Sequence, residues 1–72
     1  MKIYIVDCDV EWDLRYEERL NPFLPTTFTE YEVRVDETKG QELKSQIIYQ
    51  LEDEYNESIN GVAYDVLEEK EV

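Results

Sequence analysis

The first segment of the chain alternates between two faces with period two over residues 2 to 12. Such a period predicts a β-strand. One face is apolar and carries Tyr4, Val6, Cys8, Val10 and Trp12. The other face begins apolar and ends acidic, with Ile3, Ile5, Asp7, Asp9 and Glu11. Because the first half of this strand is apolar on both faces, we expect it to be central in a sheet or to be covered on its second face by another segment or subunit.

Two later segments have the same period. Over residues 29 to 37, one face carries Tyr31, Val33 and Val35 and the other carries Glu30, Glu32, Arg34 and Asp36. This pattern predicts a half-buried strand. Residues 62 to 72 predict the last strand, with one face formed by Val62, Tyr64 and Val66.

Between these two strands, apolar residues recur with a helical period of about 3.6 residues. This pattern predicts a helix from about Gly40 to about Asn56. Thr38 and Gln41 have the spacing of a capping box, which would satisfy free N–H groups at the helix start. Asn60-Gly61 would then end the helix or form a tight turn. The apolar stripe consists of Leu43, Ile47, Ile48, Leu51 and Tyr55. The opposite side carries Glu42, Tyr49, Asp53 and Glu57.

Residues 13 to 27 show the weakest pattern. Trp12, Tyr16 and Leu20 have helical spacing, and Asn21-Pro22 would end such a turn because a residue before proline avoids the helical region. The following residues are irregular but apolar. The apolar residues of this segment are Phe23, Leu24 and Phe28. We expect these side chains to cap an edge of the core or to cover Ile3 and Ile5.

The order of these elements predicts an α+β fold, in which a small antiparallel or mixed sheet of about three strands packs against one main helix. The order is strand, irregular segment, strand, helix, strand. Without an internal repeat or a linker, residues 1–72 are expected to form a single domain. The predicted core is the apolar side of each pattern, formed by Val6, Cys8, Val10, Val33, Val35, Leu43, Ile47 and Leu51.

The charge of the chain restricts its partners. Nineteen Asp and Glu oppose seven Lys and Arg, which gives a net charge of -12. Such a chain repels nucleic acid and anionic membranes, so we expect neither to bind directly and we expect basic protein surfaces as partners. The single cysteine cannot form an intrachain disulfide, and the N-terminal apolar run ends after Val6. These features indicate a cytoplasmic protein.

The acidic row at the end of the first strand could carry metal or phosphoryl chemistry. Asp7-Cys8-Asp9 resembles the first motif of haloacid-dehalogenase-type phosphatases, but that family needs a doubly wound scaffold larger than 72 residues. Five acids have the spacing of the ligands in an EF-hand calcium loop, namely Asp7, Asp9, Glu11, Asp13 and Glu18. Such a loop normally has Gly at its sharp turn, where this chain has Trp12. With no His and one Cys in the chain, we expect no enzyme, no metal site and no cofactor.

The alternative use of the row is protein binding. Alternate residues of a strand are about 6.6 to 6.8 Å apart, a spacing comparable to that of phosphates along DNA. An acidic row can therefore enter a basic groove built for nucleic acid. The predicted partner-binding residues are Asp7, Asp9, Glu11, Asp13, Glu42, Tyr49, Asp53 and Glu57. Alternatively, these side chains only keep two exposed faces solvated.

In charge and size, the chain resembles small acidic proteins of phages and mobile elements that act as DNA mimics, such as anti-CRISPR, anti-restriction and glycosylase-inhibitor proteins. The resemblance implies an inhibitor that blocks a nucleic-acid-binding protein. A second interpretation is a small structural or adaptor domain that forms a homodimer, with its acidity serving solubility. The surface for this dimer would consist of Ile3, Ile5, Phe23, Leu24 and Phe28.

Overall fold

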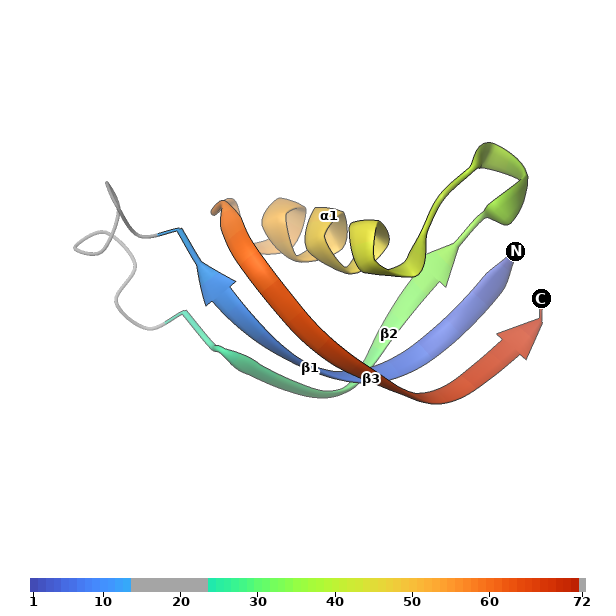
Figure 1. Ribbon diagram of the computed structural model, residues 1–72, viewed down its shortest axis with the longest axis horizontal. Helices are drawn as coiled ribbons and strands as arrows, with labels where there is room; N and C mark the ends of the chain where they lie inside the picture. Colours follow the sequence, from blue (N-terminus) through green and yellow to red (C-terminus); the bar gives the residue numbers. More distant parts are fainter. Residues whose placement is uncertain (14–23, 72) are drawn as a thin grey trace.

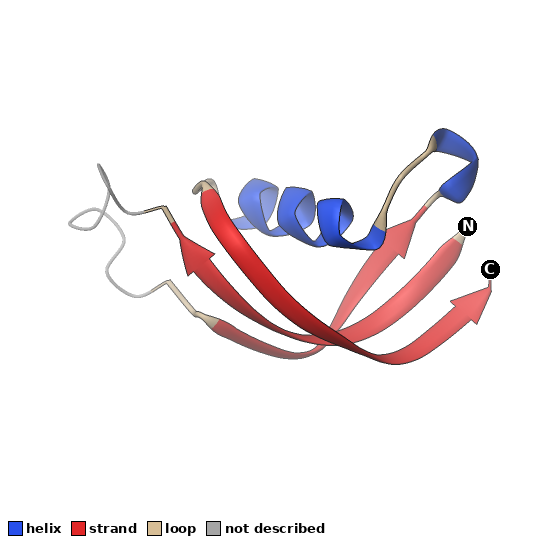
Figure 2. Cartoon of the chain, in the orientation of Figure 1, coloured by secondary structure: helices blue, strands red, loops and turns tan. Residues whose placement is uncertain are grey.

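The computed structural model describes residues 1–13 and 24–71. The elements are β1 (Lys2–Trp12), β2 (Thr27–Val35), a short 3-10 helix η1 (Glu37–Lys39), α1 (Leu43–Tyr55) and β3 (Ile59–Glu71). The strands form an antiparallel sheet in the order β2-β1-β3. The sheet is strongly curved, and α1 lies along its concave side (Figure 1). Together they make two layers, which confirms the predicted α+β fold (Figure 2).

The strands follow the predicted alternation but differ in length. β1 has the predicted bounds, whereas β2 begins at Thr27 and therefore includes Phe28. β3 begins at Ile59, so Asn60 and Gly61 lie inside a strand and form neither a helix end nor a tight turn. The expected helical turn after Trp12 falls outside the described residues. In the described part of the chain, no helix is long and apolar enough to span a membrane.

The predicted capping box is wrong, and the helix begins later than expected. The Asp36 side chain accepts from the N–H of Thr38 (3.1 Å) and so caps η1. The Gln41 side chain accepts from the N–H of Asp36 (2.7 Å) and does not cap α1. Gly40, with a φ of 72°, ends η1 in the left-handed conformation that glycine adopts without strain. These contacts keep the chain from entering α1 before Leu43.

The core lies between α1 and one face of the sheet. Ile47 and Leu51 are fully buried against the strands. Of the predicted core, Leu43 is only half-buried, because it lies in the first turn of α1 at the rim of the cluster. Trp12 lies on the predicted apolar face of β1 but is missing from the predicted core set, and the structure shows it buried as well. The complete buried set is Val6, Cys8, Val10, Trp12, Val33, Val35, Ile47 and Leu51.

Aromatic side chains close one end of this core. The Trp12 ring meets Tyr55 edge-on at 5.6 Å, and its Nε1 donates to the carbonyl of Pro25 (2.8 Å). Phe28 lies 5.9 Å from Tyr55 between the ring centroids. Phe28 and Leu24 therefore pack at the core, as one of the two expectations had it, and they do not cover Ile3 and Ile5. Phe23 is outside the described residues.

The packing of α1 generates a stability prediction. Truncating the fully buried Ile47 to Ala should lower the free energy of unfolding by about 2 to 5 kcal/mol, through lost burial and a new cavity. Tyr49→Ala is the matched control on the outer side of the same helix, where the residue is 66% exposed. The control should stay within about 0.5 kcal/mol of the wild type in urea unfolding. Equal losses for both variants would show that the buried side of α1 is misassigned.

Candidate functional site

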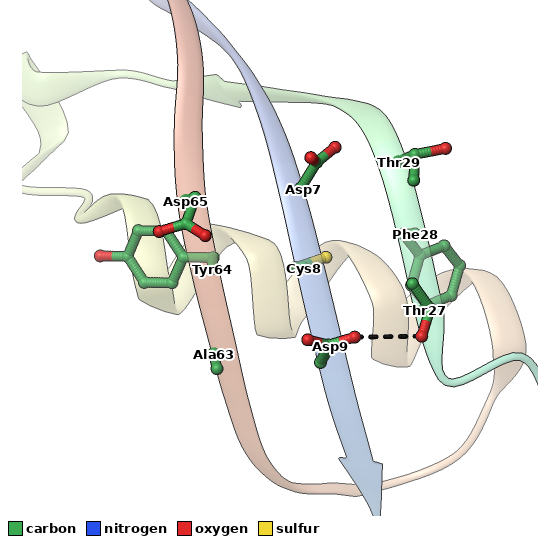
Figure 3. Close-up of a pocket in the computed structure, with 9 residues that line it drawn as sticks. All are labelled: Asp7, Cys8, Asp9, Thr27, Phe28, Thr29, Ala63, Tyr64 and Asp65. Atoms are coloured by element: carbon green, nitrogen blue, oxygen red, sulfur yellow. Dashed lines mark hydrogen bonds between the residues drawn. The ribbon is translucent and has the colours of Figure 1, made fainter.

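The face of the sheet that α1 does not cover is here named the open face. It is formed around the β1 residues that alternate with the buried ones. Figure 3 shows Asp7, Asp9 and Asp65 on this side of the sheet, with α1 behind it. The β1 members are Ile3, Ile5, Asp7, Asp9 and Glu11. Cross-strand neighbours from β2 and β3 complete the face.

One half of the open face is apolar and has compensated charges. Ile3 lies opposite Arg34 and Lys70, and Ile5 lies opposite Glu32 and Glu68. Both isoleucines are half-buried. The two glutamates form ion pairs, between Arg34 Nε and Glu32 Oε2 (3.8 Å) and between Lys70 Nζ and Glu68 Oε1 (3.7 Å). Long charged side chains can shield apolar neighbours with their aliphatic stems.

The other half, here named the acidic half, consists of Asp7, Asp9, Glu11 and Asp65. Asp7 lies directly opposite Asp65 across β1 and β3, and Glu11 lies opposite Gly61. No Lys or Arg of residues 1–13 and 24–71 makes an ion pair with any of these four acids. Like charges directly opposite one another destabilise a sheet. We therefore expect the Asp7–Asp65 pair to lower the stability of the fold.

Asp7 and Asp9 are also fastened to β2. The register of β2 against β1 shifts between Tyr31 and Phe28, and Glu30 has a φ of 52° at this bulge. Its N–H donates to Asp7 Oδ1 (3.0 Å). Thr27 Oγ1 donates to Asp9 Oδ1 (3.0 Å), as the dashed line in Figure 3 shows. An ionised carboxylate has about four lone-pair sites, so each of the two can still accept from a partner.

The structure divides the predicted binding residues between two sides of the molecule. Asp7, Asp9 and Glu11 share the open face, and Asp13 follows β1 with its N–H donated to the Ser58 carbonyl (2.8 Å). The helix residues lie on the α1 side, across the thickness of the fold. There Glu42, Tyr49 and Asp53 are exposed, and Glu57 is half-buried between α1 and β3.

Asp65 is the residue of the acidic half that sequence reasoning missed. The alternation over residues 62 to 72 already placed it opposite the face of Tyr64 and Val66. Its position beside Asp7 depends on β3 pairing with β1, and no local pattern gives the strand order. Together, the aspartates and Thr27 border a shallow depression of about 360 Å³.

Hydrogen bonding and ion pairing define what the acidic half can do. Carboxylates and threonine hydroxyls can accept from the N–H groups of Lys and Arg side chains. In the part of the chain that the structure describes, no group of three Cys, Asp or Glu side chains is arranged to hold a metal ion.

Comparisons with protein-family models, with curated proteins and with solved structures find no match to this chain.

Cys8 lies beneath the acidic half and belongs to the core, with 3% of its surface exposed. Burial raises the pKa of its thiol, and the neighbouring Asp9 and Asp7 raise this pKa further. Because the thiolate is the reactive form, we expect native Cys8 to react slowly with a thiol reagent at neutral pH and quickly after unfolding in urea. Labelling at the same rate in both states would contradict the burial.

The aspartate pair generates a second prediction. Asp65→Asn removes the charge opposite Asp7 while keeping the side-chain shape, and should raise the free energy of unfolding by about 0.2 to 1 kcal/mol. Glu11→Gln removes a charge that faces Gly61 instead and serves as the control. The gain should shrink in high salt, where exposed charges are screened. An Asp65→Asn protein no more stable than the control would show that the two aspartates do not repel measurably.

Proposed function

We propose that this protein is a non-enzymatic acidic binding protein whose open face docks on a basic surface of a nucleic-acid-binding protein. The observation that supports the proposal is the acidic half, above all Asp7 opposite Asp65 without a counter-ion among the described residues. A basic partner would relieve this repulsion, because its cations would stand between the two carboxylates. Binding would then recover the free energy that the isolated fold loses.

The layout of the acids supports nucleic-acid mimicry as the mode of binding. Acids at alternate positions of β1 are about 6.6 to 6.8 Å apart along the strand. Asp65 adds a charge on the neighbouring strand at a separation of about 4.7 to 4.9 Å between strands. A groove that binds a phosphate backbone presents cations at comparable spacing. By occupying such a groove, the protein would act as an inhibitor that competes with nucleic acid.

The proposal assigns docking to the open face and gives the outer side of α1 no part in it. Glu42 and Asp53 lie on the far side of the sheet from Asp9, so one flat partner surface cannot contact both sets. Tyr49 lies with the helix acids and is likewise directed away from the open face. The two sides therefore provide an internal comparison for mutagenesis.

Self-association is the second candidate function. The half-buried Ile3 and Ile5 on the open face favour it, since a second copy could cover them. The other described members of the predicted dimer surface, Leu24 and Phe28, pack against the core, so the surface is smaller than predicted. A dimer that persists in high salt during sedimentation would favour this alternative, because apolar contacts are not screened by ions.

The proposal is tested with two variants that remove equal charge from the two sides. The open-face variant is Asp9→Asn, Glu11→Gln, Asp65→Asn, and it leaves Asp7 in place to hold Glu30. The α1-side variant is Glu42→Gln, Asp53→Asn, Glu57→Gln. The wild type and each variant are immobilised and exposed to a nuclease-treated lysate of the source cells at low and high salt. We expect the wild type and the α1-side variant to retain nucleic-acid-binding proteins that the open-face variant loses.

Captured proteins are then purified and mixed with their nucleic acid in a gel-shift assay. The wild type should displace the nucleic acid, and the open-face variant should do so with slower association and a weaker salt dependence. Equal capture by both variants would show that the open face is not the docking surface. Capture without displacement would exclude mimicry and leave a simple binding protein.

A further inference from the structure

Among residues 1–13 and 24–71, no strand lies beside the outer edge of β3. In the order β2-β1-β3, β3 is a terminal strand, and all its residues from Ala63 to Glu71 are exposed (Figure 1). Along such an edge, alternate residues direct their N–H and C=O groups away from the sheet. These groups form a template on which another strand can pair.

The other edge, on β2, is less open to pairing. Glu30 interrupts it with a left-handed residue at the bulge. The Gln50 side chain reaches over from α1 and donates to the Glu32 carbonyl (2.8 Å). A bulge twists an edge away from a flat template, and a bonded carbonyl is not free for a new strand. β3 is therefore the edge that can accept a partner.

The usable part of β3 runs from Gly61 to Val66. Over this stretch, each residue pairs with β1 in uninterrupted register. The register then shifts at Leu67, an extra residue that ends the regular edge. On the α1 side of the stretch, Tyr64 is 37% exposed and Val66 is 47% exposed. The edge thus combines free backbone groups with uncovered apolar side chains.

We propose that the outer edge of β3 binds an extended segment of the basic partner as a fourth, antiparallel strand in which apolar and basic residues alternate. The inference rests on the proposed function and names how the partner is held. A strand added beside β3 would extend the open face by one column. Its backbone would supply affinity, and its side chains would supply specificity.

The alternation follows from the two faces of β3. A residue opposite Asp65 lies on the open face, in line with the Asp7–Asp65 pair, where a Lys or Arg would meet two carboxylates. Residues opposite Tyr64 and Val66 lie on the α1 side, where apolar side chains would cover exposed surface. The residue opposite Ala63 returns to the open face, next to the row that holds Asp9. The fitting segment therefore reads apolar, basic, apolar, basic, apolar.

Charge argues for a basic segment over a second copy of the chain. Two copies with a net charge of -12 each repel one another. Pairing of two β3 strands would also add acids to an edge where Asp65 already lacks a cation among the described residues. A basic strand meets the complementary charge instead. Pairing with a second copy remains one outcome that the experiment can detect.

The test uses two capped synthetic peptides of equal composition and charge. In one, Val and Lys alternate; in its isomer, all Lys are grouped at one end. Docking on the β3 edge predicts that the alternating peptide binds at least about tenfold more tightly than the grouped isomer. The backbone hydrogen bonds to β3 form only when the peptide side chains alternate to the correct faces. Amide exchange measured by NMR should slow at alternate residues of Gly61–Val66. Tyr64→Ser with Val66→Ser should weaken the alternating peptide only.

N-methylation of the alternating peptide gives a sharper control. Methyl groups are placed on every second amide, in each of two frames. In one frame they block the bonds to β3, and in the other they point to solvent. One frame should therefore lose at least about tenfold in affinity while the other binds normally. Equal loss in both frames would overturn strand pairing.

The remaining outcomes separate this inference from the proposed function. Equal, salt-sensitive binding of both isomers, lost in the open-face variant and without slowed exchange in β3, would overturn edge pairing and leave acidic docking intact. Pairing that persists unchanged in the open-face variant and in high salt would support the edge and contradict docking through the acids. Slowed exchange of β3 amides with rising protein concentration, without peptide, would assign the edge to a second copy and overturn the inference.

Discussion

The central strand β1 has two faces, and in the part of the chain that the structure describes one α-helix, α1, covers one of them. Ile47 and Leu51 of α1 fill the space over Val6 and Val33, and the burial of these side chains holds the two layers together. No second helix among the described residues covers the opposite face. The alternation of β1 therefore decides both properties of the molecule. Its even-numbered residues from Val6 onward make the core, and its odd-numbered residues make an open face on which acids are tolerated.

The bulge in β2 connects this open face to the shape of the sheet. A bulge bends its strand and increases the local twist, which suits a sheet that curves around a helix. The bulge leaves the N–H of Glu30 without a ladder partner, and Asp7 accepts from it. Asp7 thus stabilises the bulge while it repels Asp65. A neutral amide side chain could also accept from this N–H, and it would do so without the repulsion.

The sequence predicts those parts of the fold that depend on local periodicity. The bounds of β1 and the burial of Ile47 follow from side-chain spacing alone. The predicted start of α1 is wrong because Thr38 and Gln41 fit a capping pattern, whereas the Asp36 side chain accepts from the Thr38 N–H and the Gln41 side chain accepts from the Asp36 N–H. The pairing of Asp7 with Asp65 could not be predicted, since it depends on contacts between distant segments. Glu30 likewise gives no signal of its left-handed conformation, which glycine or asparagine would have given.

An exposed edge strand is a liability for any sheet protein, because it pairs with whatever strand it meets. Here the same acids that would recruit a basic strand also oppose pairing between copies. Screening limits this effect to a Debye length of about 8 Å at physiological salt, so charges on α1 contribute little at the edge. On β3, Glu68 and Glu69 each lie within 4.0 Å of a lysine nitrogen, at 3.7 Å and 3.8 Å. Among the described residues, Asp65 makes no ion pair beside the regular stretch of the edge, so on the proposed mode of binding its charge would discriminate between a second copy and a basic partner.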